Sequence, residues 1–86
     1  GAVVELPRLL AYRRDEQRVA PLRSLPGAIL HAKWRDSEWT EPAEQGLDLA
    51  RAAPAGAGDC VVRLLQDDEL LDQIDARPGK SDRGPS

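Results

Sequence analysis

Two tryptophans, Trp34 and Trp39, are the residues of this chain best suited to binding a ligand. They lie five positions apart in the stretch 27–39, and the only other aromatic ring among Phe, Trp and Tyr is Tyr12. The face of an indole ring has a negative electrostatic potential, so such rings beside a carboxylate attract an ammonium or guanidinium group. The same rings could instead fill a small hydrophobic core, and the sequence leaves both interpretations open.

An acidic partner for these rings is available in the segment 66–75, which holds five acidic residues and no basic one. Asp67, Asp68 and Glu69 stand together within it. Such a run is most often a solvated face and otherwise a site for a basic ligand. Residues 1–40 have a formal charge of +2 and residues 41–86 a charge of −5, which gives the chain its net −3. A net acidic chain disfavours nucleic acid as the partner.

The residue types of this chain do not favour a metal site or an enzyme active site. Cys60 and His31 are the only soft ligands, whereas a structural zinc site needs four, so we expect no metal and no cofactor. The glycines of 55–58 lack the Lys-Ser/Thr that completes a phosphate-binding loop, and no Gly-x-Ser-x-Gly turn is present. Cys60 lies in an apolar run, which predicts a buried, unreactive thiol. We therefore expect a protein that is not an enzyme.

The size of the chain limits its organisation to one small domain. Its 86 residues divide into a β-rich domain, 1–76, and a tail, 77–86, that has no large apolar residue and is predicted to be disordered. A folded part of about 75 residues has a thin stability margin, which favours a module of a larger polypeptide or one completed by a partner. Neither a membrane-spanning run nor the layout of a signal peptide is visible, so we expect a soluble intracellular protein.

Short strands are predicted to position these residues. Segments 9–13 and 18–23 flank the polar residues 14–17, which favours a hairpin with Pro21 on an edge strand. Residues 28–35 alternate in the period of a half-buried strand. This strand places Trp34 on the same face as Leu30 and Ala32, and His31 on the exposed face with Lys33. The Gly-rich residues 54–59 predict a loop, and the β-branched run 60–65 predicts a strand.

Two segments allow either helix or strand. Residues 40–53 begin with the signals of a helix start, but Gly46 interrupts them and the leucines at 47 and 49 alternate, so we favour a strand. Residues 67–76 place Leu70, Leu71 and Ile74 at helical spacing behind three acidic residues. A short C-terminal amphipathic helix is therefore predicted there.

Residues 26–39, Pro26-Gly27-Ala-Ile-Leu-His-Ala-Lys-Trp34-Arg-Asp-Ser-Glu-Trp39, resemble the opening of Tudor-type domains and of their PWWP and chromo-barrel relatives. In these families a glycine precedes a strand that ends in Ala-x-aromatic, and a short acidic turn and a second aromatic follow. Residues 58–69 are similar to the later hairpin of that barrel. Over residues 26–74 the resemblance implies a mainly β protein, a small SH3-like (Tudor-type) barrel of about five strands. Where full aromatic cages have further rings, however, this chain has residues 64–66, Leu-Leu-Gln.

Two functions follow as hypotheses. The resemblance implies a Tudor-like chromatin reader that binds a basic, histone-type peptide, with or without lysine methylation, which would place it in the nucleus. Its ligand-binding residues would be Trp34, Trp39, Tyr12, Asp67, Asp68 and Glu69. The alternative is a docking or assembly domain of a larger multidomain protein, which packs the acidic helix 67–76 onto a partner through its leucines. Indole rings exposed in one concavity favour the reader, whereas buried rings and an exposed leucine face favour docking.

Overall fold

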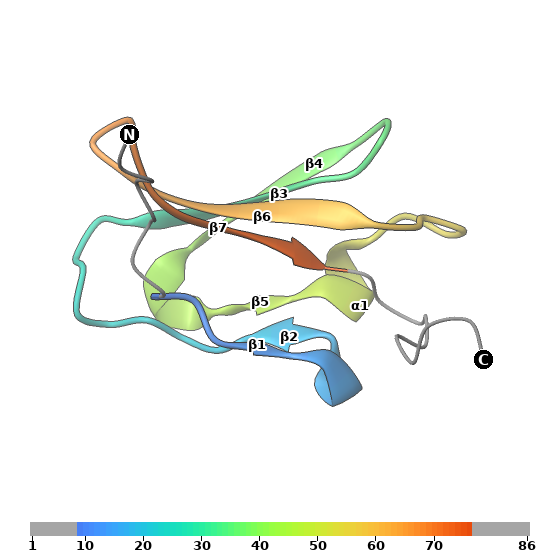
Figure 1. The fold of residues 1–86 in the computed structure, drawn as a ribbon, viewed down its shortest axis with the longest axis horizontal. Helices are drawn as coiled ribbons and strands as arrows, with labels where there is room; N and C mark the ends of the chain where they lie inside the picture. The colour runs from blue at the N-terminus through green and yellow to red at the C-terminus, as the bar shows by residue number, and fades with distance from the viewer. Residues whose placement is uncertain (1–8, 77–86) are drawn as a thin grey trace, which may run out of the picture.

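The computed structural model describes residues 9–76 and folds them into two antiparallel sheets (Figure 1). The larger sheet contains, in spatial order, β4 (Glu38–Pro42), β3 (Ile29–Lys33), β6 (Cys60–Gln66) and β7 (Glu69–Ala76). The smaller sheet contains β1 (Tyr12–Arg13), β2 (Arg18–Val19) and β5 (Leu47–Asp48). Short helical turns connect strands: η1 (Arg14–Glu16), η2 (Ala43–Gln45) and α1 (Leu49–Ala52). The protein is therefore mainly β, as predicted.

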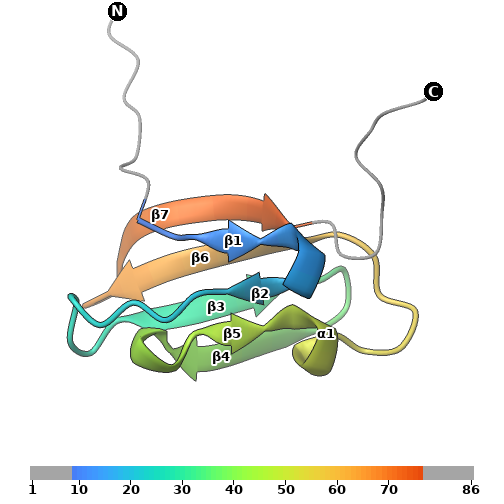
Figure 2. The same cartoon turned by 90° about the horizontal axis from the view of Figure 1, so that it is seen from below.

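The number of strands and their closure differ from the prediction. Residues 9–76 form seven strands rather than about five, and the two sheets are open rather than joined into one closed barrel. Each strand of the smaller sheet is only two residues long, so its ladders are too short to continue around a barrel. Figure 2 shows the smaller sheet lying across the larger one, with β4 and β5 along one side of the molecule and β7 and β1 along the other.

The predicted C-terminal helix is wrong, because residues 69–76 form β7. Asp67 and Asp68 have positive φ angles of 53° and 67°, which makes them the two-residue turn of a β-hairpin that returns the chain along β6. A bulge then follows, since Leu65 pairs with Leu70 but Leu64 pairs with Asp72. The extra residue lets side chains three positions apart both contact the core, a spacing that imitates a helix.

The predicted strand at 28–35 is confirmed as β3, and its buried face is the predicted one. Leu30 and Ala32 are fully buried and Trp34 is 3% exposed. The strand predicted at 60–65 is confirmed as β6, and the loop predicted at 54–59 separates α1 from it. β3, one of the two central strands of the larger sheet, thus has one apolar face, and Trp34 follows directly after the strand.

The hairpin predicted around residues 14–17 is confirmed by the pairing of β1 with β2. The expected place of Pro21 on an edge strand is wrong: β2 ends at Val19, and β2 is the central strand of its sheet. Residues 40–53 are only partly strand, because β4, η2, β5 and α1 divide them. At Gly46, between η2 and β5, the chain passes from the larger sheet to the smaller one with a φ of 73°.

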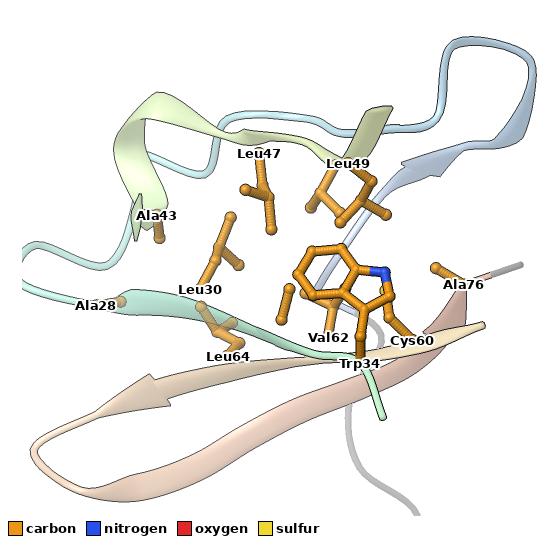
Figure 3. Close-up of a cluster of buried hydrophobic side chains, with 12 residues drawn as sticks. Ala28, Leu30, Trp34, Ala43, Leu47, Leu49, Cys60, Val62, Leu64 and Ala76 are labelled. Atoms are coloured by element: carbon orange, nitrogen blue, oxygen red, sulfur yellow. The ribbon is translucent and has the colours of Figure 1, made fainter. Parts of the chain in front are cut away.

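The core fills the space between the sheets (Figure 3). Its largest fully buried side chains are Leu30, Leu49, Leu64, Val19 and Val62. Asp72 on β7 is 4% exposed. Its Oδ2 accepts hydrogen bonds from the backbone N–H groups of Leu9 and Leu10, both at 2.8 Å, and so holds these residues against β7. The predicted disordered tail, 77–86, and the first eight residues lie outside the described part of the chain.

Candidate functional site

Trp34 is a core residue in this structure. Its indole ring stands at the end of β3 among the core side chains of Leu49, Val62 and Cys60 (Figure 3), and the residue is 3% exposed. The buried indole N–H has no hydrogen-bond partner among the described residues. The residue borders a hollow of about 610 Å³ between residues 35–37 and the loop 54–59. With only a few per cent of its surface accessible, the ring offers no open face to a ligand.

Trp39 is the exposed member of the pair. It pairs with Ala32 across the β3–β4 ladder and therefore points to the inner side of the larger sheet, but β4 is the edge strand, so the residue stays 40% exposed. Its indole N–H donates a hydrogen bond of 2.9 Å to Oε2 of Glu41, which lies on the same strand face two residues later.

The indole of Trp39 borders a hollow of about 310 Å³ between β4 on one side and β5 and α1 on the other. The residues that line it are Arg18, Trp39, Glu41, Gln45, Gly46, Leu47, Asp48, Arg51 and Ala52. Trp34 is not among them. The two tryptophans thus border different hollows, and the structure does not bring them together in one aromatic cage.

Tyr12 does not supply another wall of such a cage. It lies on β1, packs against the core while partly buried, and its hydroxyl has no hydrogen-bond partner within residues 9–76. Burial and the nearby Cys60 raise the pKa of this phenol. Burial also raises the pKa of the Cys60 thiol to about 11, with smaller contributions from Asp59 and Asp75. A thiol of this kind stays protonated near neutral pH and is a poor nucleophile.

The predicted acidic residues also lie away from Trp39. Trp39 and Val62 are level with each other on the sheet, since both pair with Ala32. Asp67 follows Val62 by five residues, on the order of 16 Å at about 3.3 Å per residue, and β6 is separated from β4 by β3. Asp68 shares the turn with Asp67, and Glu69 begins β7. Of the six predicted site residues, Trp39 alone borders the 310 Å³ hollow.

Glu41 is the residue that sequence reasoning missed. The signal was present in the sequence, because a glutamate two positions after an exposed aromatic on a strand shares its face. This contact could be predicted only if residues 38–42 were first assigned to a strand, and the sequence from residue 40 onward also has the signals of a helix start. Arg18, Leu47 and Arg51 could not have been assigned to this hollow from the sequence, because only the crossing from one sheet to the other brings β2, β5 and α1 beside β4.

Two acidic residues, Glu41 and Asp48, border the hollow, and neither has an ion pair within residues 9–76. Asp48 pairs with Arg18 across the β2–β5 ladder, and its Oδ1 accepts a hydrogen bond of 3.3 Å from the backbone N–H of Arg51. The bond from Arg51 comes from its backbone, and neither arginine forms an ion pair with Asp48 within residues 9–76. The carboxylate of Glu41 accepts a hydrogen bond from the Trp39 indole and from no other side chain in this part of the molecule. A negative charge therefore stands beside an exposed aromatic ring.

A second charged pair lies on the opposite face of the same hairpin. His31 Nε2 and Glu38 Oε1 are 2.7 Å apart, and Lys33 Nζ lies 3.9 Å from Glu38 Oε2. The hydrogen bond from His31, and then the charge of Lys33, lower the pKa of Glu38. His31, which was predicted on the exposed face of the strand, is therefore only partly exposed and is hydrogen-bonded to a carboxylate on β4.

Residues 9–76 contain no candidate metal site and no candidate membrane-spanning helix. No group of three or more His, Cys, Asp or Glu residues in this part of the chain is placed to hold a metal ion. None of its helices has the length and apolar character needed to cross a membrane. Comparisons of the chain with models of protein families, with curated proteins and with solved structures found no match.

Proposed function

We propose that this domain is a non-enzymatic protein-interaction module that binds a basic peptide at the hollow beside Trp39. The observation that carries the proposal is the Trp39–Glu41 pair: an indole that is 40% exposed, held at 2.9 Å by a carboxylate with no ion pair in the described part of the chain. An exposed aromatic face and a carboxylate both bind a cationic side chain favourably. The aromatic face attracts the cation and the carboxylate neutralises it.

The proposed contact has a modest energy. A cation over an exposed indole gains about 0.5–1 kcal/mol, and an exposed ion pair contributes about 0.2–1 kcal/mol. A lysine or arginine bound in this way discriminates weakly by itself, so the peptide needs further contacts. Arg18 and Arg51 border the same hollow, and their charges favour a partner that places its cation near Glu41 rather than near Asp48.

The finer fold and family assignment is part of this proposal. An SH3-like, Tudor-type arrangement is supported by two small sheets packed over one core and by a chain that passes from β4 through η2 into β5. The site would differ from a full cage, since one indole replaces several aromatic walls. We therefore expect a basic-peptide binder for which lysine methylation changes affinity little. A histone-type partner and a nuclear location would follow from such a ligand.

The docking hypothesis depended on an amphipathic helix predicted at 67–76, but residues 69–76 form the strand β7. Leu70 is 38% exposed, whereas Leu71 and Ile74 pack against the core. These side chains do not form an exposed leucine face. Basic-peptide binding is therefore the better-supported function of the two.

Titration of the protein with lysine-rich peptides tests the proposal. A lysine decapeptide should shift the Trp39 indole N–H signal in NMR spectra, and a glutamate decapeptide should not. Trp39→Ala and Glu41→Gln should each weaken binding, while Leu70→Ala, an exposed substitution on β7, should not. Equal binding by the wild type and Trp39→Ala would contradict the proposal.

A further inference from the structure

The hollow beside Trp39 adjoins an unpaired sheet edge. β4 is the outermost strand of the larger sheet, and no described strand pairs with its outer side. β7, the opposite edge, is different: the carboxylate of Asp72 points inward and binds the backbone of Leu9 and Leu10. A buried charge and a bulge protect an edge from pairing with another chain. The β4 edge has neither of these two features, and its protection is limited to Pro42 at its end and the charged side chains of Glu38 and Glu41.

The backbone groups that β4 presents can be identified from its ladder. The backbone N–H of Ala43 donates to the C=O of Ala28 at 2.9 Å, and the backbone N–H of Trp34 donates to the C=O of Ser37 at 2.8 Å. The register of β3 against β4 is constant between these two pairs. Because hydrogen-bonded and non-hydrogen-bonded pairs alternate, the odd-numbered residues of β4 face β3. Glu38 and Thr40 therefore direct both their N–H and C=O groups outward, and Pro42 directs its C=O outward. The edge offers two donors and three acceptors in register.

The side chains alternate in the opposite sense. Trp39 and Glu41 lie on the inner face, beside the hollow, while Glu38 lies on the outer face with 58% of its side chain exposed. A strand added at this edge would place every second side chain against the Trp39–Glu41 pair and the others near Glu38. The inner face would present the carboxylate of Glu41 to it, whereas the carboxylate of Glu38 on the outer face is already engaged by His31 and Lys33.

We propose that the partner is an extended basic segment that binds as an additional antiparallel strand along the outer edge of β4, in keeping with the antiparallel ladders of the larger sheet. Its backbone pairs with Glu38 and Thr40, and its inward lysine or arginine side chains lie against Trp39 and Glu41. Pro42 has no N–H, so pairing ends there and the strand is confined to a short register. This inference rests on the proposed function and adds the conformation of the partner. Charge complementarity with Glu41, which has no ion pair among residues 9–76, selects a basic segment over an acidic one.

Backbone methylation of a peptide provides the test. The probe is a capped decapeptide of alternating lysine and threonine. In an antiparallel added strand with its lysines directed toward Trp39, the threonine N–H groups face β4 and the lysine N–H groups face away. N-methylation of the threonines should weaken binding by about tenfold or more, because two or more backbone hydrogen bonds of about 0.5–1.5 kcal/mol each are lost. N-methylation of the lysines should change affinity by less than about twofold, since those N–H groups make no bond to β4.

A pair of protein variants gives an independent test. Thr40→Pro removes the central outward donor at a position where an edge strand tolerates proline, and Thr40→Val keeps the backbone intact. We expect Thr40→Pro to weaken binding of the unmethylated peptide and Thr40→Val to leave it unchanged. A circular dichroism spectrum and melting curve establish that both variants are folded.

The outcomes separate this inference from the proposed function. If both methylated peptides bind like the parent while Trp39→Ala still abolishes binding, strand addition is wrong and the proposed function stands. If the lysine-methylated peptide alone loses affinity, the strand is parallel or its lysines lie on the outer face, and either result overturns the inference. If the parent peptide does not bind, both fail. Concentration-dependent dimerisation that Thr40→Pro abolishes would identify a second copy of the chain as the occupant and also overturn it.

Discussion

The indole N–H of Trp39 and the carboxylate of Glu41 are joined by a hydrogen bond of 2.9 Å on one face of an edge strand. Strand alternation places the two side chains together, and the edge position of β4 keeps the ring 40% exposed. The carboxylate holds the ring by its polar edge, so its apolar faces are not used by this bond. The pair thus combines an oriented aromatic surface and a negative charge before any ligand arrives.

The two tryptophans should differ sharply in their contribution to stability. Trp34→Ala should lower the free energy of unfolding by about 3–5 kcal/mol, because it leaves a cavity in a small core. Trp39→Ala should lower it by about 1 kcal/mol or less, because the ring is 40% exposed. Urea denaturation followed by circular dichroism measures both. Similar losses for the two variants would contradict the assignment of Trp34 to the core and Trp39 to the surface.

Substitution of Gly46 by alanine should lower the stability of the protein, whereas the same substitution at Gly58 should not. A Cβ at Gly46 would lie 2.7 Å from the carbonyl oxygen of Val19, and its φ of 73° with a ψ of −172° is a conformation essentially confined to glycine. Gly46→Ala should therefore cost more than about 1 kcal/mol of stability. A Cβ at Gly58 meets nothing within 4 Å, so Gly58→Ala is the matched control. Equal melting temperatures for the two variants would count against the described passage between the sheets.

Asp72 should be a stability determinant despite its charge. Its two oxygens accept from the backbone of Leu9, Leu10 and Gln73 at 2.7–2.8 Å. Asp72→Ala leaves these N–H groups without their acceptor and should cost about 1–3 kcal/mol. Hydrogen exchange should accelerate at Leu9 and Leu10 in this variant. Unchanged exchange at both amides would show that the carboxylate does not fasten this segment.

The pKa of Glu38 should report the bond with His31. This bond, followed by the charge of Lys33, lowers the pKa from its ordinary value of 4.5. A carboxyl group with a lowered pKa in the folded state stabilises the fold above its unfolded pKa, and this contribution is lost as the pH falls through the folded value. His31→Gln should raise the Glu38 pKa towards 4.5, and Lys33→Gln should raise it less. NMR titration of the Glu38 side-chain carbon measures both shifts, and an unchanged pKa in His31→Gln would show that the bond is absent in solution.

The sequence predicted those elements whose local pattern and tertiary position agree. Alternation in 28–35 identified β3 and its buried face, including Leu30 and Ala32, because a strand in the middle of a sheet buries one complete face. β7 was predicted as a helix because its bulge places Leu71 and Ile74, three residues apart, against the core. That spacing arises from pairing with β6, which no local pattern contains.

The candidate site was predicted only in part for a similar reason. Trp39 was identified by residue type, and its exposure depends on β4 being an edge. The acidic partner was sought in 67–69 because charge density there is high, yet the sheet carries that turn away from Trp39. Glu41 supplies the carboxylate instead, because it lies two residues after Trp39 on the same face of β4.

Binding of a basic peptide at Trp39 is the central claim, and one NMR titration tests it most directly. Uniformly ¹⁵N-labelled protein is titrated to millimolar concentration with the alternating lysine–threonine decapeptide at low and at high salt. The account predicts that the Trp39 indole signal and the Glu38 and Thr40 amides shift together, that the Trp34 indole stays in place, and that affinity falls as salt rises. No shift of the Trp39 indole signal at millimolar peptide, or equal shifts of both indoles, would contradict it.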